Sequence, residues 1–112
     1  MTEPTLNIDA EIQSYKDSIA LRDALVRLEK NPDFKKVVLD HYGDEFAKQL
    51  VMQRADPSFR ARPEVMEANT RKIDAVSEFF GYIRTLHAIG ANAAANLPVS
   101  EQTRDAILEE QE

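Results

Sequence analysis

A chain of 112 residues has the size of a single domain, and its net charge is −6. The absence of cysteine excludes a disulfide framework, a thiolate zinc site and a cysteine nucleophile. The acidity lies at the ends, because residues 99–112 sum to −4 and residues 1–11 to −3, which leaves +1 for residues 12–98. No basic segment leads into an apolar run, and no uncharged apolar run approaches the roughly 18 residues of a membrane span. We therefore expect a cytoplasmic protein without a membrane partner.

The first expected element is a helix that begins at Asn7 or Asp9. Apolar residues from Ile8 to Leu28 recur at spacings of three and four, which places them on one side of a helix. This helix should end just before Asn31, because Asn31 can act as an N-cap with Pro32 at the first helical position. A second helix is therefore expected to start there.

Gly43 should end this second helix, because glycine tolerates the positive φ of a helix C-terminus. Asp44 can then cap a third helix that reaches about Ala55. Two short helices around a glycine can form a DNA-binding helix-turn-helix, but Asp44 and Glu45 would then face the phosphates. The sequence favours a structural helical hairpin.

Polar residues around Gly43 are the best candidates for a metal or acid/base cluster. They are Asp40, His41, Asp44 and Glu45, and His41 and Glu45 would share one face of a continuous helix. A helix break at Gly43 removes that register, so we interpret the cluster as capping residues. We expect no catalytic residue, no metal ligand and no cofactor, since no nucleophile and base, phosphate loop or zinc motif is present.

The longest expected element is a helix from Glu64 to about Asn96, which follows a connection bracketed by Pro57 and Pro63. Pro63 can open this helix, because a proline at the first helical position loses no hydrogen bond. Two neighbouring apolar rows run along it, and together they are too broad for one narrow seam. They predict contact with more than one helix, from the same chain or from a second copy. The small residues of "AIGANAAAN" form either a close packing surface or a high-propensity helix end. The interface candidates are Met66, Ile73, Val76, Phe79, Phe80, Ile83, Leu86, His87, Ile89 and Gly90.

Leu97 and Pro98 should end the long helix, so we predict one helical domain over residues 1–98. Residues 99–112 form either a short helix from Ser100 or a disordered acidic tail. The predicted fold is all-α, with two long helices that bracket a short helical hairpin and with a core that a second copy can complete.

The segment from Ser18 to Val51 resembles small helical proteins of tailed bacteriophages that carry an LxxNPDFKK motif. In these proteins a leucine-rich helix leads into the motif, and an aromatic residue and an A..LV helix follow. The resemblance implies a phage context and no specific activity. The matching residues are Leu25, Leu28, Asn31, Pro32, Asp33, Phe34, Lys35, Lys36, Tyr42, Ala47, Leu50 and Val51.

Two functional hypotheses follow for a protein of this kind. The first is a non-enzymatic, self-associating helical protein that serves virion assembly as a scaffold, chaperone or minor structural component. The alternative is a small acidic inhibitor that binds a host nucleic-acid enzyme. Both require a protein partner, from the virion or from the host. Both place the chain in the host cytoplasm, and the first hypothesis also allows a place in the virion. Direct nucleic-acid binding is not expected, because the basic residues between Arg54 and Lys72 are interspersed with Asp56, Glu64 and Glu67.

Overall fold

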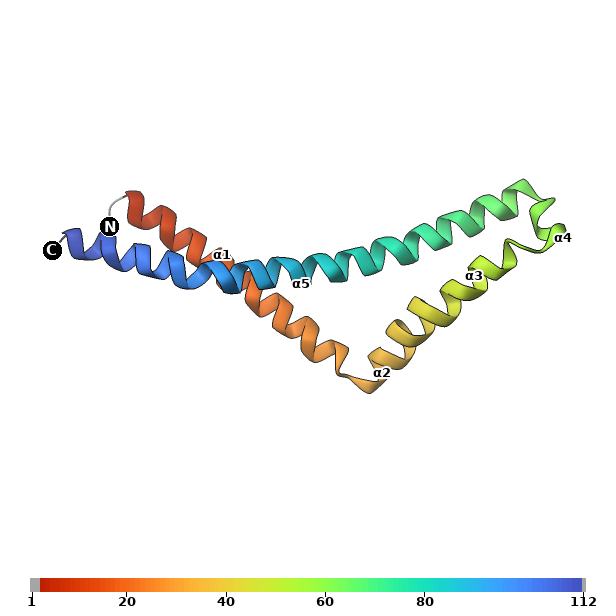
Figure 1. The fold of residues 1–112 in the computed structure, drawn as a ribbon, viewed down its shortest axis with the longest axis horizontal. Helices are drawn as coiled ribbons and strands as arrows, with labels where there is room; N and C mark the ends of the chain where they lie inside the picture. Colours follow the sequence, from red (N-terminus) through yellow and green to blue (C-terminus); the bar gives the residue numbers. More distant parts are fainter. Residues whose placement is uncertain (1–2, 112) are drawn as a thin grey trace. The chain divides into compact units, whose positions relative to one another are not determined.

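The computed structural model describes residues 3–111, and this part of the chain is helical without strands (Figure 1). The predicted all-α fold is confirmed, with two long helices that bracket short helical segments. The first helix begins earlier than expected, before Asn7. The elements are α1 (Glu3–Glu29), α2 (Pro32–Phe34), the π-helix η1 (Lys35–Phe46), α3 (Ala47–Gln53), α4 (Pro57–Arg60) and α5 (Pro63–Gln111).

Contacts divide the chain into two compact units. The paired-helix unit consists of residues up to Val26 together with those from Thr85 onward. In this unit α1 and the second half of α5 run antiparallel, because Asp9 pairs with Arg104 and the later α1 residue Arg22 lies against the earlier α5 residue Gly90. The looped unit is Arg27–Arg84, in which η1 and α3 pack against the first half of α5.

Asn31 and Pro32 act as predicted. The Asn31 side chain accepts hydrogen bonds from the backbone N–H groups of Asp33 and Phe34 at 3.0 and 3.1 Å, and Pro32 occupies the first helical position. The expected break at Gly43 is wrong. Gly43 lies inside η1 with a negative φ, and Asp44 is an interior helical residue rather than an N-cap.

The turn of the hairpin lies instead between α3 and α4. Asp56 caps α4, because its carboxylate accepts hydrogen bonds from the Ser58 N–H at 2.9 Å and the Ser58 hydroxyl at 2.8 Å. These bonds favour the charged carboxylate, so they lower the pKa of Asp56 below its ordinary value. Pro63 then opens α5 as expected.

The expected end of the long helix at Pro98 is also wrong, because α5 continues through Pro98 to Gln111. Proline in a helix interior removes a backbone hydrogen bond and costs about 3 kcal/mol. Contacts with α1 hold the residues beyond it. Ser100 is buried and its hydroxyl donates to Glu11 at 3.3 Å, and Arg104 lies 3.8 Å from Asp9. Residues 99–111 are therefore helical, and Ser100 and Arg104 hold them against α1.

One row of α5 turns inward at intervals of seven residues. It consists of Asn69, Val76, Ile83, Gly90, Leu97 and Arg104, all buried or half-buried. A strict seven-residue repeat is the spacing of coiled-coil packing. On α1, Ile12 and Leu25 are buried. In each unit the core is therefore a narrow seam between α5 and the helix that packs against it.

Candidate functional site

The predicted interface residues of α5 fall into two groups. Val76, Ile83 and Gly90 are buried in the seam. Met66, Ile73, Phe80, Leu86 and His87 are half-buried beside it, whereas Phe79 is 38% and Ile89 is 47% exposed. Helices of the same chain therefore occupy the seam row, and part of the neighbouring row faces solvent.

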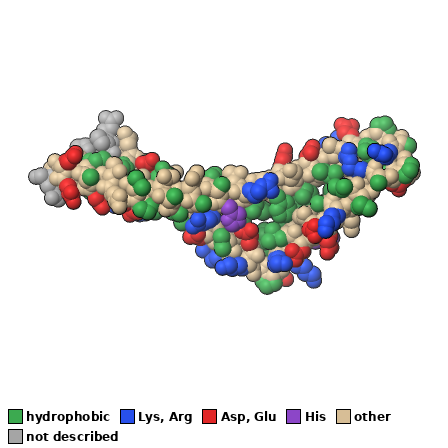
Figure 2. Space-filling view, viewed as in Figure 1, with side chains coloured by type: hydrophobic (Ala, Val, Ile, Leu, Met, Phe, Trp, Pro, Cys, Tyr) green, Lys and Arg blue, Asp and Glu red, His purple; other side chains and the backbone are tan. Residues whose placement is uncertain are grey.

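An aromatic cluster joins η1 to α5 in the looped unit. Tyr42 stacks on Phe46 and lies edge-on to Phe79, with both centroid separations at 5.9 Å. Gly43 sits against the Phe80 ring, and a Cβ at this position would come within 2.8 Å of Phe80 Cε2. Gly43 thus serves close helix approach rather than a turn. Figure 2 shows hydrophobic side chains gathered between these helices.

A buried polar network, which the sequence analysis did not identify, fixes α3 to α5 in the looped unit. Asn69 is 3% exposed, and its amide donates to the Leu50 carbonyl oxygen at 2.8 Å. Arg54 Nη1 donates to Asn69 Oδ1 at 3.1 Å and to Thr70 Oγ1 at 2.8 Å. The Leu50 carbonyl belongs to the last turn of α3, where carbonyls lack helical partners. The sequence signal for this network was a polar residue, Asn69, seven residues before Val76 and therefore in the same row of α5.

Three of the four candidate residues around Gly43, namely Asp40, His41 and Glu45, share one face of η1 because the helix is unbroken there, whereas Asp44 lines another groove and pairs with Lys48. Lys36, Asp40, His41 and Glu45 line a shallow surface cavity together with Val37. Asp40 accepts from Lys35 Nζ at 2.9 Å and is thereby paired. Among the described residues, no group of three or more His, Asp or Glu side chains could hold a metal ion. The polar side chains on this face are exposed to solvent.

Most of α5 in the paired-helix unit is exposed and uncharged. The segment from Thr85 to Ser100 contains no Asp, Glu, Lys or Arg, although 30% of the chain is charged. Only Gly90, Ala93 and Ser100 are buried in it. Solvent-exposed helix faces normally carry charged and polar residues. The exposed residues are Thr85, Ala88, Ile89, Ala91, Asn92, Ala94, Ala95, Asn96, Pro98 and Val99.

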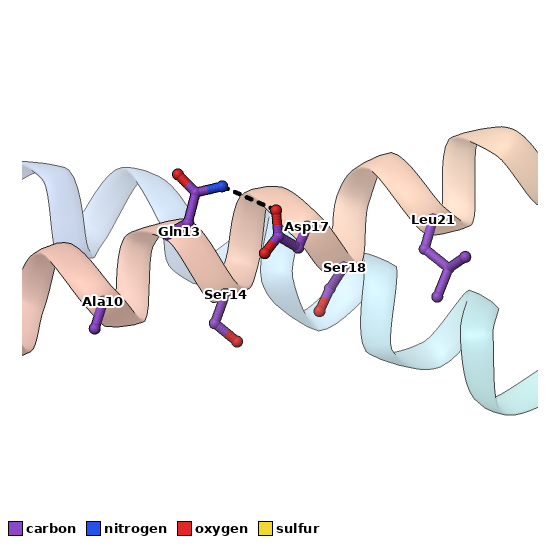
Figure 3. A pocket seen from close by; sticks show the side chains of 6 residues that line it. All are labelled: Ala10, Gln13, Ser14, Asp17, Ser18 and Leu21. Atoms are coloured by element: carbon purple, nitrogen blue, oxygen red, sulfur yellow. Dashed lines mark hydrogen bonds between the residues drawn. The ribbon is translucent and has the colours of Figure 1, made fainter.

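A groove runs between α1 and this segment of α5 and has a volume of about 340 Å³. Ser14, Tyr15 and Ser18 form its α1 wall, and Ile89, Asn92, Ala93 and Asn96 form its α5 wall. Tyr15 donates to Glu11 at 3.1 Å, a bond to an anion that raises the Tyr15 pKa. The α1 wall continues into a row of small side chains, Ala10, Ser14 and Ser18, that ends at Leu21, which is 50% exposed (Figure 3). Gln13 and Asp17 line the other side of this row, where Gln13 donates a hydrogen bond to Asp17 at 2.8 Å.

The two acidic ends of the sequence meet in the paired-helix unit. Arg104 lies 3.8 Å from Asp9 and 3.7 Å from Asp105, so one cation serves two carboxylates. Glu109 and Glu110 follow on the exposed last turns of α5. Figure 2 shows acidic side chains toward this end of the unit. The sequence reading treated the two ends separately and did not anticipate their pairing.

Comparison with known protein families, curated proteins and solved structures finds no match to this chain. In the described part of the chain, no helix combines the length and apolar character needed to cross a membrane.

Proposed function

We propose that this chain is a non-enzymatic helical interaction protein that serves phage virion assembly as a scaffold, chaperone or minor structural component. The uncharged exposed surface of α5 from Thr85 to Val99 is the observation that supports a binding role. Its aliphatic residues Ile89 and Val99 are 47% and 60% exposed, and exposed apolar side chains of this kind mark sites of protein interaction. The virion context comes from the resemblance around the NPDFKK segment.

The looped unit adds further exposed apolar side chains on α3. Val51 is 56% and Met52 is 72% exposed, and both line a shallow groove of about 340 Å³ with Gly43 and Ala47. Methionine adapts to varied partner surfaces because its side chain is unbranched and polarizable. This groove supports binding to protein rather than catalysis, since the residues around it form ion pairs such as Lys48 with Asp44 at 3.0 Å.

The pairing of the acidic ends favours a second candidate, an inhibitor of a host nucleic-acid enzyme. Asp9, Glu11 and Asp105 lie at one end of the paired-helix unit, where they could imitate a run of phosphates. However, Arg104 and Ser100 already bond to Asp9 and Glu11, so part of this acidity is used internally. We therefore rank virion assembly first.

Affinity purification of the tagged full chain from phage-producing cells tests the choice. We expect virion structural proteins to be recovered and to persist at high salt, because an uncharged surface is insensitive to ionic screening. Salt-sensitive recovery of a nuclease or polymerase would replace this proposal with the inhibitor. Recovery of neither class would refute both.

A further inference from the structure

We infer that the uncharged face of α5 binds the same face of a second copy of this chain in antiparallel orientation. This inference deepens the proposed function and rests on it for the biological role. The face consists of Thr85, Ile89, Asn92, Asn96, Val99 and Thr103, which are all exposed. We call this set the α5 stripe.

The spacing of the α5 stripe is the first argument. Its members follow one another at intervals of four, three, four, three and four residues, which is the a/d spacing of a coiled coil. This series reads the same in both directions. An antiparallel second copy therefore brings every stripe residue opposite another stripe residue.

The chemistry of the stripe is the second argument, because it is also symmetric. In the antiparallel register, Thr85 meets the second copy's Thr103, and Ile89 meets its Val99. Asn92 meets the second copy's Asn96, so amides face amides at the centre and aliphatic side chains face each other on either side. A parallel pair would instead place each residue against itself. Polar residues at such positions commonly set register.

The asparagines keep hydrogen-bonding capacity for this contact. Asn96 Nδ2 donates to the Asn92 backbone carbonyl at 2.9 Å within the same helix. A carboxamide has two N–H donors and an acceptor oxygen, so this bond leaves an N–H and the oxygen of Asn96 for a facing amide. Pairing with a second Asn is therefore compatible with the helix.

The α5 stripe alone is too small for a stable dimer interface, so α1 must contribute to the contact. The stripe spans about 27 Å at 1.5 Å per residue, and at a helix width of about 10 Å it covers roughly 270 Å². A stable interface buries about 800 Å² per partner. The groove lined by Ser14 and Ser18 adjoins Ile89 and Asn92, so a helix seated there contacts α1 as well. Two copies would complete a four-helix bundle.

Charge substitutions on the full chain test both face and register, with sedimentation velocity over a range of concentrations as the measurement. We expect the parent to dimerise, and Ile89→Lys and Val99→Glu each to weaken the dimer at least tenfold. The chain with both substitutions should regain dimer affinity, because each new lysine meets a new glutamate of the second copy. Ala94→Glu adds the same charge on the opposite side of α5 and should leave the dimer intact. All of these positions are exposed, so circular dichroism should show unchanged folding.

Orientation has its own readout because the chain has no native cysteine. Single-cysteine chains carrying Thr85→Cys or Thr103→Cys should form a disulfide when mixed and very little when oxidised alone. Disulfides formed by each chain alone would establish a parallel pair and overturn the inference. So would a monomeric parent, or a Val99→Glu chain that dimerises like Ala94→Glu.

The outcome is separable from the virion-assembly proposal. A monomeric chain that still recovers virion proteins would refute the second copy alone. A dimer that recovers no virion protein would refute the assembly role alone.

Discussion

Replacing Gly90 with alanine tests whether α1 and α5 cross as closely as the paired-helix unit indicates. A Cβ at Gly90 would overlap Arg22 Cβ and lie 2.7 Å from Arg22 Cγ and 2.9 Å from Arg22 Cδ. Because these atoms form the base of the side chain, rotation of Arg22 cannot clear them all, and the helices must separate. Alanine raises helix propensity by about 1 kcal/mol. Overpacking costs about 1–3 kcal/mol, so after the propensity gain we expect a net loss of up to about 2 kcal/mol.

Gly81→Ala is the matched control for this substitution. Its Cβ would lie 3.7 Å from Arg84 Nη2, an ordinary contact, so the propensity gain of up to about 1 kcal/mol should persist. Urea unfolding followed by circular dichroism, at one protein concentration, gives both free energies. Adding Arg22→Gly to Gly90→Ala moves the glycine to the other helix. The two substitutions should then be less destabilising together than the sum of their separate effects, by a coupling free energy of at least about 1 kcal/mol. A Gly90→Ala chain as stable as Gly81→Ala would refute the close crossing.

Three further substitutions probe other features. Asn69→Ala should lower the free energy of unfolding in urea by about 2 kcal/mol, because it leaves a buried α3 carbonyl without a donor. Replacing the exposed Thr70 with alanine should lower it by less than about 0.5 kcal/mol. Equal losses for the two substitutions would contradict the network. Pro98→Ala should stabilise the chain by up to about 3 kcal/mol, and a loss of stability would mean that α5 ends there. The Asp56 carboxylate is bonded to Ser58 and its pKa is lowered on folding, so its stabilisation is present above its unfolded pKa and is lost as pH falls through the folded value. The melting temperatures of the parent and Asp56→Asn should therefore converge in acid, and a difference that grows in acid would contradict this linkage.

Local signals were sufficient for much of the fold. The spacing of three and four gave α1 and most of α5, and the cap at Asn31 with Pro32 was correct because its hydrogen bonds join neighbouring residues. Pro63 likewise opens α5, since a proline at the first helical position loses no hydrogen bond. These features depend on a few adjacent residues.

The candidate surface was only partly predictable. Both apolar rows of α5 appeared as one broad stripe, and periodicity alone could not separate Ile83, which is buried, from Ile89, which is 47% exposed. The choice depends on where α1 and η1 lie. Asn69 was missed for the same reason, because its partners Leu50 and Arg54 are distant in sequence.

The sequence by itself determined the helical character, the helix starts at Asn31 and Pro63, and the uncharged run beyond Thr85. Only the tertiary structure decided how Gly43 and Pro98 are used. Gly43 had the conformational freedom to end a helix, but contact with Phe80 uses its small size instead. Pro98 weakens α5 locally, yet the contacts of the residues that follow it with α1 keep the helix continuous. Contacts between distant residues outweighed the local preference at both positions.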